Sequence, residues 1–387
     1  MPAHLSARKI LEKLVSFPTT SSESNLDLVD WVEDYLDGFG VTAHRKYNAD
    51  GTKASLFASV GPDVTGGVIL SGHTDVVPVA GQNWATDPWA VTEKQGRLYG
   101  RGTCDMKGFD ALALAAVPLA IERGVSRPLQ IALSRDEEVG CIGAPDMIDE
   151  MAAILPRAAL AIVGEPSMMK TVTGHKGSTG FHVHLRGFEV HSSLQHKGVN
   201  AVMFAAKLIE WANQKFAENA AAVPSAVAGS FDPPYTTVHV GTIRGGTAHN
   251  ITAKDCWLGL DIRCVPDQDI DDWAQQFGDK VDEVAAQMQA IHPDGGIDLD
   301  RYFDIPPLRP ETDGAAEKLV RSLTGDNGTH VVSYGTEAGQ FQERGYSTVI
   351  CGPGDIAQAH QPNEFIALSQ FEAGEKFVAR VVDSLTG

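Results

Sequence analysis

The sequence has few cysteines, and their placement argues against two common kinds of site. Only five cysteines occur among 387 residues, an odd number, and no two of them form a Cys-x-x-Cys pair. This count and spacing argue against a disulfide framework and against a structural zinc site built from thiolates. Both observations fit a reducing compartment, and we therefore expect a cytoplasmic protein.

Long hydrophobic runs and a basic charge balance are also missing. The apolar stretch at residues 111–120 is shorter than a membrane span and contains Pro118. The first residues lack the apolar segment that a signal peptide needs. Lys and Arg number 31 against 50 Asp and Glu, which gives a formal net charge of −19. This acidity argues against nucleic acid or a membrane as a partner and favours small molecules or metal ions.

The length of the chain predicts two domains, and we find no internal repeat. Helical and strand patterns alternate up to about residue 177. A block with the order strand, helix, strand, strand, helix follows, which is typical of a small α+β domain inserted into another. We expect residues 1–177 and 293–387 to form one α/β domain and residues 178–292 to form the inserted domain.

A His and a carboxylate follow the apolar run at residues 68–70. If this run is a strand, its two-residue period places His73 and Asp75 on one face at the carboxyl end. Open α/β sheets carry their chemistry at that end. A strand that simply ends in a polar turn would explain these two residues equally well.

Other acidic residues occupy similar positions later in the chain. Glu137 and Glu138 follow one predicted strand, and Glu165 ends another. Asp105 precedes an Ala/Leu-rich helix, where an acidic residue is commonly an N-cap. Chance explains one such ending, but several together with His73 indicate a site.

The candidate metal ligands carry nitrogen and oxygen donors and no thiolate. They are His73, Asp105, Glu138, Glu165 and His360. This donor set suits zinc, cobalt or manganese. Three carboxylates and one hydroxide would balance two divalent ions and still lower the pKa of a bound water to roughly 7. Glu137 is then free to act as general base, and Asp75 can hydrogen-bond the far nitrogen of His73.

Several motifs occur in the order found in one known family. They are residues 71–75, 102–108, 136–138, 164–166 and 191–193. With them the sequence resembles the M20 family of dizinc metallohydrolases. The resemblance implies a mixed-sheet zinc-hydrolase catalytic domain with an inserted ferredoxin-like domain for dimerisation. It also implies that Asp105 bridges two ions, with His73 and Glu165 on one and His360 and Glu138 on the other, and that Glu137 is the base.

The resemblance also assigns residues of the inserted domain. It implies that His191 reaches the partner subunit's active site and stabilises an oxyanion, although a lone His is more often structural. Arg263, which alone would be a sheet-surface residue, would pair with a substrate α-carboxylate. Asn250 would lie near the substrate, unless it only serves a turn. Lys176, within a motif at residues 174–177, joins this substrate-binding set.

Two acidic residues near the end of the chain are candidates for holding a cationic substrate side chain. These are Glu337 and Asp355, and a role as loop residues in water explains them equally well. Cys104 and Cys141 stand beside motif residues, but no His is spaced to activate either thiol, and we expect both to be packing residues.

The resemblance implies a cytoplasmic, metal-dependent amidohydrolase that forms a homodimer through the inserted domain. It implies two divalent ions, zinc first and cobalt or manganese as alternatives. Within the family, residues 174–177, 334–338 and 352–364 make the sequence resemble members that remove an acyl group from the α-nitrogen of an amino acid. Another N-acyl amino acid, such as N-succinyl-diaminopimelate, or a dipeptide remains open as substrate. A metal-free relative that only binds is a further alternative, against which the complete ligand set argues.

Overall fold

The computed structural model describes residues 4–387, which divide into two compact units. The first unit comprises the residues up to 174 together with 308–330 and 336–387. The second comprises residues 175–307 and 331–335. One unit is therefore inserted into the other along the chain.

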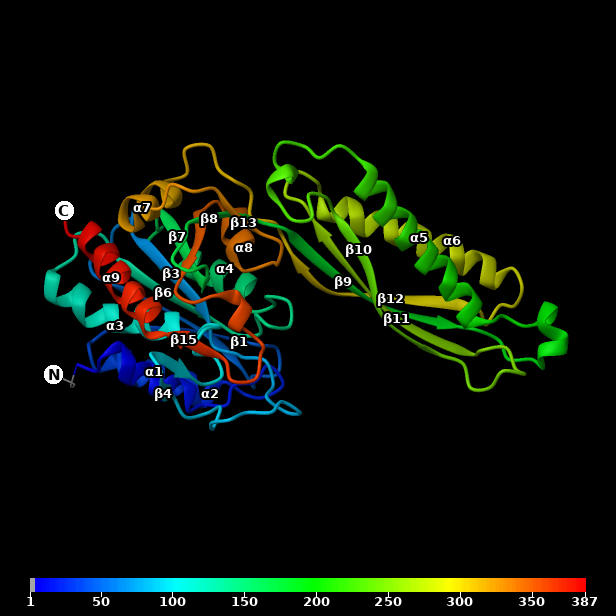
Figure 1. Cartoon of the computed structure of the whole chain (residues 1–387), viewed down its shortest axis with the longest axis horizontal. Coiled ribbons are helices and arrows are strands. Elements are labelled where there is room, and N and C mark those ends of the chain that lie inside the picture. Colours follow the sequence, from blue (N-terminus) through cyan, green and yellow to red (C-terminus); the bar gives the residue numbers. More distant parts are fainter. Residues whose placement is uncertain (1–3) are drawn as a thin grey trace. The chain divides into compact units, whose positions relative to one another are not determined.

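The first unit is built on a mixed sheet of eight strands, which confirms the predicted α/β class (Figure 1). Its strand order is β1 (Ala43–Tyr47), β2 (Ala54–Val60), β6 (Leu129–Ser134), β3 (Val68–His73), β7 (Leu160–Pro166), β14 (Ser347–Gly352), β8 (Val172–His175) and β13 (His330–Val332). The four central strands, β6, β3, β7 and β14, run parallel. Their residues are buried on both faces, as in parallel sheets covered by helices.

Helices cover both faces of this sheet. One hydrophobic core joins the sheet to α1 (Ala7–Val15), α2 (Leu26–Asp37), α3 (Lys107–Arg123), α7 (Ala315–Thr324) and α9 (Leu368–Ser384). The other face carries α4 (Ala144–Ile154) and α8 (Ala338–Glu343), which contact each other. Helix α3 is buried on nearly every side, which explains its Ala/Leu-rich sequence. A small sheet of β4 (Thr92–Lys94), β5 (Arg97–Tyr99) and β15 (Phe365–Ala367) completes the unit together with the short η3 (Ile356–Gln358).

The second unit has one antiparallel sheet and two long helices. Its strand order is β10 (Thr237–Gly245), β11 (Asp255–Cys264), β9 (Gly177–Arg186) and β12 (Gly296–Ile305). Helices α5 (Ala201–Ala221) and α6 (Ile270–Gln289) pack against this sheet and share its core. Short turns η1 (Ser192–Lys197) and η2 (Ala228–Ser230) lie in its loops. The chain order βαββαβ is that of ferredoxin-like folds, as expected.

The predicted return to the first domain at residue 293 is wrong. Strand β12 pairs with β9 from Gly296 opposite Arg186 to Ile305 opposite Ser178. This pairing supplies the fourth strand that the inserted fold needs, so the second unit continues to residue 307. The first segment of the first unit likewise ends at residue 174 rather than 177, a few residues before β9 begins at Gly177.

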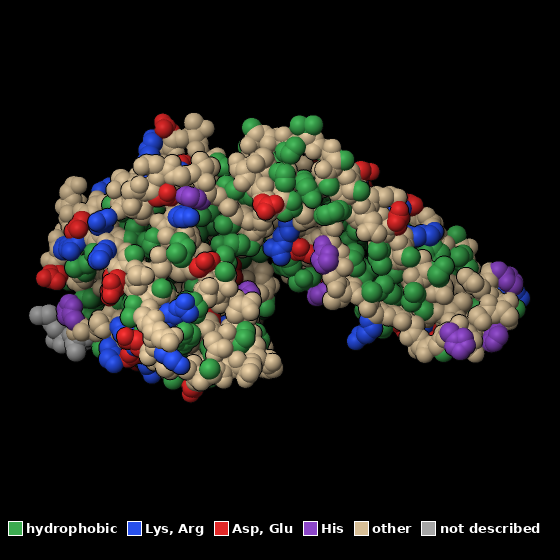
Figure 2. All heavy atoms as spheres, in the orientation of Figure 1, with side chains coloured by type: hydrophobic (Ala, Val, Ile, Leu, Met, Phe, Trp, Pro, Cys, Tyr) green, Lys and Arg blue, Asp and Glu red, His purple; other side chains and the backbone are tan. Residues whose placement is uncertain are grey.

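Figure 2 shows acidic and basic side chains interspersed over the visible face of the first unit. Among the described residues, no helix has the length and hydrophobicity needed to cross a membrane. All five cysteines are buried, and none of them forms a disulfide bond.

Candidate metal centre

Polar side chains lie at the carboxyl ends of the parallel strands, along one edge of the first unit's sheet. His73 is the last residue of β3, and Glu165 lies next to the end of β7. Glu137 and Glu138 follow β6, whereas the chain after β14 leads to His360. The carboxyl ends of parallel strands meet at one edge, and this explains why residues far apart in sequence converge here.

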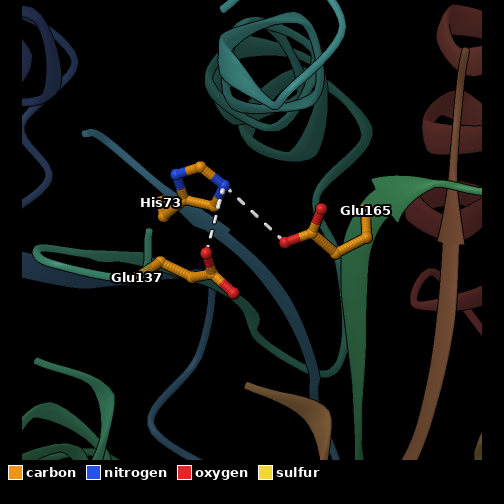
Figure 3. Close-up of side chains that lie close together, drawn as sticks. All are labelled: His73, Glu137 and Glu165. Atoms are coloured by element: carbon orange, nitrogen blue, oxygen red, sulfur yellow. Dashed lines mark ion pairs between the residues drawn. The ribbon is translucent and has the colours of Figure 1, made fainter. Parts of the chain in front are cut away.

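The imidazole of His73 lies among three carboxylates. Its Nε2 is 3.1 Å from Asp105 Oδ1, 3.7 Å from Glu165 Oε1 and 4.0 Å from Glu137 Oε2. Figure 3 shows how His73, Glu137 and Glu165 point toward one another. His73 is 1% exposed, so this group of charges is largely removed from water.

A second His approaches the opposite side of Asp105. His360 Nε2 is 3.3 Å from Asp105 Oδ2 and 2.9 Å from Glu138 Oε2. Each carboxylate oxygen of Asp105 therefore faces a different imidazole. Asp105 is not a helix cap, since Met106 occupies the N-cap position of α3. The structure thus brings all five sequence-predicted ligands together.

Within residues 4–387, two sets of three side chains have the spacing to hold a divalent ion. His73, Asp105 and Glu138 form one set, and His73, Glu137 and Glu165 form the other. Within each set the ligand atoms lie within 4.8 Å of one another. The second set contains Glu137, the residue predicted to act as general base, so its carboxylate is also close enough to the other two ligands to bind an ion.

Burial and crowding shift the protonation of these groups. Burial and the neighbouring charge of Asp105 raise the pKa of Glu138 to about 8 and raise that of Glu165 well above its usual value. Burial also raises the pKa of Glu137. Burial opposes the charge of His73, but the hydrogen bond with Asp105 and the nearby carboxylates raise its pKa well above the usual value. The surroundings therefore favour positive charge at the centre of the cluster.

The donor chemistry and one unpaired atom fit bound divalent cations. Glu138 Oε1 is buried and has no hydrogen-bond partner in the described structure. A buried carboxylate oxygen without a partner is costly unless a cation binds it. His73 Nδ1 lies 2.9 Å from the main-chain carbonyl of Asp75. Because a carbonyl only accepts, Nδ1 carries the proton in the neutral ring and Nε2 is available to a metal.

The predicted role of the Asp75 carboxylate needs correction. Its Oδ1 is 3.7 Å from His73 Nδ1, too far for the expected hydrogen bond, which the main-chain carbonyl of Asp75 makes instead. The carboxylate accepts from the backbone N–H groups of Glu137 at 3.1 Å and Glu138 at 3.3 Å. It also accepts from the hydroxyl of Ser21 at 2.7 Å. Asp75 therefore holds the turn that carries both glutamates.

Glu337 lies in the first unit but is not a free surface carboxylate. It is 1% exposed, and its oxygens accept from the hydroxyls of Ser134 and Ser71. Burial raises its pKa to about 8. A contact with a substrate cation would require this carboxylate to leave the two serines. Asp355 is exposed, and its carboxylate caps η3 by accepting from Ala357 N–H at 3.0 Å.

Four sequence-predicted residues belong to the second unit. Lys176 is buried, and its ammonium donates to the carbonyls of Pro233 at 2.7 Å and Tyr235 at 2.8 Å. Burial lowers the pKa of Lys176 to about 8. These contacts give it a structural role in its own unit, and its substrate role stays a prediction.

The other three residues of this group lie on or near the surface of the second unit. His191 is exposed and contacts Ser193 Oγ through Nδ1 at 2.8 Å. Arg263 donates from Nε to Asp261 at 2.9 Å, and Asn250 is exposed in a loop. Their predicted roles at a substrate also stay predictions.

Sequence reasoning missed two residues that contact the site. The thiol of Cys141 donates to Glu137 Oε1 at 3.2 Å, so Cys141 is more than the packing residue expected. Burial raises the pKa of this thiol well above its usual value, which keeps it protonated as a donor. Glu364 binds the loop that carries Asp105. The position of Glu364, four residues after His360 in the sequence, could have indicated that it lies near the site.

Comparison with known proteins assigns the chain to a family. Residues 69–384 match the family described as Peptidase family M20/M25/M40. The chain belongs to this family. Acetylornithine deacetylase of Myxococcus xanthus is 34% identical over 98% of this chain and 97% of its own length. Acetylornithine deacetylase of Pasteurella multocida is 32% identical over 95% of each chain.

Solved structures of this family show the same fold. An M20 metallo-carboxypeptidase from Sulfolobus solfataricus superposes with a TM-score of 0.79 at 18% identity, covering 97% of this chain and 98% of its own. Family membership together with the full-length relatives identifies the protein as a metal-dependent amidohydrolase. The carboxylate–histidine cluster is the part of the first unit suited to that chemistry.

Proposed function

We propose that this M20 enzyme removes the acetyl group from N2-acetyl-L-ornithine and releases acetate and L-ornithine. The observation that carries the proposal is the near full-length similarity to acetylornithine deacetylases of two organisms. The metal-ligand cluster supplies the chemistry that such a reaction needs. The product ornithine would feed arginine biosynthesis, and we expect the enzyme to act in the cytoplasm as a homodimer.

Two divalent ions fit the cluster, zinc before cobalt or manganese. His73 and Glu165 would hold one ion and His360 and Glu138 the other, with Asp105 between them, in keeping with its two oxygens facing the two imidazoles. Bound ions of this kind lower the pKa of water and polarise the amide carbonyl. The Asp75 carboxylate accepts hydrogen bonds from the backbone N–H groups of Glu137 and Glu138. Asp75 would thereby hold Glu137 in place as the base and Glu138 as a metal ligand.

Glu137 would move the proton during amide hydrolysis. Its carboxylate takes a proton from water, and the water oxygen attacks the acetyl carbonyl carbon. The carbon–nitrogen bond then breaks, and Glu137 gives the proton to the leaving amine. His191 would stabilise the oxyanion. Arg263 would pair with the α-carboxylate of the substrate, while Asn250, Lys176 and Glu337 complete the proposed substrate-binding set.

A panel of amides tests the proposed substrate. The purified enzyme is loaded separately with zinc and with cobalt, then assayed on N2-acetyl-L-ornithine, N-succinyl-LL-diaminopimelate and an unmodified dipeptide. We expect kcat/KM for acetylornithine to exceed that for the other two by at least about tenfold, a difference of about 1.4 kcal/mol in transition-state binding. Hydrolysis of the dipeptide alone would overturn the proposal, and preference for the succinyl substrate would move the enzyme to a different deacylase.

A further inference from the structure

Two buried charged side chains lie beside the metal centre without belonging to the ligand set. Arg101 and Glu364 are each 1% exposed, and Arg101 Nη1 is 2.8 Å from Glu364 Oε2. Neither is accessible to a substrate. Desolvation of two charges offsets most of their attraction, so such a pair is weak evidence for stability alone. Its other hydrogen bonds indicate what it organises.

The Glu364 carboxylate binds the backbone of the loop that ends at Asp105. Oε1 accepts from the N–H groups of Cys104 at 2.8 Å and Asp105 at 3.1 Å. Oε2 accepts from Gly102 N–H at 3.0 Å in addition to Arg101. Contacts to three main-chain donors leave this loop little freedom to shift.

Arg101 extends the same network to the loop that carries His360. Its Nη2 donates to Gln82 Oε1 at 2.6 Å, and Gln82 Nε2 donates to the carbonyl of His360 at 2.9 Å. Strand β15 begins directly after Glu364 and pairs with β5, with Phe365 opposite Tyr99. The backbone of Glu364 is thereby fixed between the two loops.

We propose that Glu364, together with Arg101, is a positioning residue that sets the spacing between Asp105 and His360. This inference takes only one point from the proposed function, which is that the side chains of Asp105 and His360 bind the same ion. Asp105 is tied through its N–H group and His360 through its carbonyl, while their side chains meet at 3.3 Å. Some residues do not bind the metal but hold its ligands in place through hydrogen bonds. Removing such a residue typically lowers metal affinity by about 10- to 100-fold.

The variant Glu364→Gln tests this role while preserving side-chain volume. An amide has one accepting oxygen, so its NH2 group would face donors at Gly102 and Arg101. Metal-free protein is titrated with Zn²⁺ by calorimetry and with Co²⁺ by absorption spectroscopy. We expect the ion shared by Asp105 and His360 to bind about 10- to 100-fold more weakly, with altered cobalt bands. Wild-type affinity for both ions in folded Glu364→Gln would overturn the proposal.

A matched control separates positioning from simple destabilisation. Asp326 also accepts from backbone N–H groups, Thr171 at 2.8 Å and the nearby Gly328 at 3.1 Å, and neither donor belongs to a candidate metal ligand. Asp326→Asn should lower the unfolding temperature and leave metal affinity unchanged. If Asp326→Asn weakened metal binding as much as Glu364→Gln, general destabilisation would explain both results and the proposal would fail.

A milder variant covers the case in which Glu364→Gln does not fold. Gln82→Ala removes the link to His360 together with the acceptor that Gln82 offers to Arg101 and Trp84, but it keeps the buried ion pair between Arg101 and Glu364. This variant should weaken binding of the ion shared by Asp105 and His360 by several-fold and leave the affinity for the other ion unchanged. Unchanged affinity for both ions would contradict the proposed network. These titrations need no substrate, so a protein that binds two ions but leaves acetylornithine intact would refute the proposed function and not this inference.

Discussion

The carboxylate of Glu137 lies between a thiol and an imidazole. Its Oε1 accepts from Cys141 at 3.2 Å, and its Oε2 is 4.0 Å from His73 Nε2. The backbone carbonyl of Glu137 also accepts from Gly140 and Cys141 N–H groups, which closes a tight turn. One oxygen is thus held while the other faces the metal ligands, as a base acting beside bound metal requires.

We expect Glu137→Gln to retain both ions and to lower kcat by about 10²- to 10⁴-fold, since the amide cannot accept the proton. KM should change little, because the shape of the side chain is preserved. Metal analysis and steady-state kinetics on the same preparation check this prediction. Loss of one ion from the variant would instead identify Glu137 as a ligand in the set with His73 and Glu165.

At the residue scale, sequence reasoning predicted which candidate ligands converge better than it predicted the contacts between them. Carboxylates and imidazoles at strand ends can be read from sequence, because strand period and parallel order determine where they converge. The partner of His73 Nδ1 could not be read in this way, since the choice between the carboxylate and the carbonyl of Asp75 depends on backbone torsion. The contacts of Cys141 and Glu364 likewise depend on loop conformation.

Close packing of α3 on β7 places the strand end that carries Glu165. A Cβ added at Gly164 would lie 2.0 Å from the ring of Phe109 in α3. The neighbouring strand β14 is equally close, because a Cβ at Gly352 would lie 1.8 Å from the carbonyl oxygen of Gly164. These glycines let helix and strands approach at the edge where the ligands converge.

Gly164→Ala should therefore destabilise the protein by about 1–3 kcal/mol, the usual cost of overpacking a core, and weaken metal binding through displaced Glu165. Thermal unfolding and metal titration measure the two effects. Gly278→Ala in α6 is the control, because no atom lies within 4 Å of the added Cβ. Alanine in that helix should raise stability by up to about 1 kcal/mol. Equal unfolding temperatures for the two variants would contradict this view of the packing.

At the element scale, strongly patterned segments could be predicted and short or charged ones could not. The helices α1, α2, α5, α6 and α9 and the buried strands β3, β6 and β7 follow from hydrophobic period or continuous apolar runs. Strand β12 was missed because Asp298, Asp300 and Arg301 interrupt its pattern on a largely exposed strand. Strands β8, β13 and β15 have only three or four residues, too few for periodicity to identify.

The insertion of one unit into the other follows from a change in sequence texture, but its end could not be read from the sequence.

The second unit presents apolar side chains on its sheet, including Ile243 at 52%, Trp257 at 39% and Tyr302 at 42% exposure. Strands β10 and β12 form the open edges of that sheet. Exposed edges and exposed apolar residues favour association with another chain.

We expect the protein to be a homodimer with twice the 41.3 kDa mass of the chain. Size-exclusion chromatography with light scattering measures this mass directly, and dilution over a wide concentration range shows how firmly the dimer holds. A mass of one chain at all concentrations would contradict both the dimer and the proposed sharing of His191 between subunits.

The central position of β14 has a consequence for synthesis of the protein on the ribosome. β14 lies between β7 and β8, yet it begins only at Ser347. The sheet of the inserted unit, whose last strand β12 ends at Ile305, can form while one edge of β7 still lacks its neighbour. Such an unpaired apolar edge is prone to self-association and is a natural target for chaperones in a growing chain. Synthesis of residues 347–387 both supplies the neighbour that β7 lacks and adds His360.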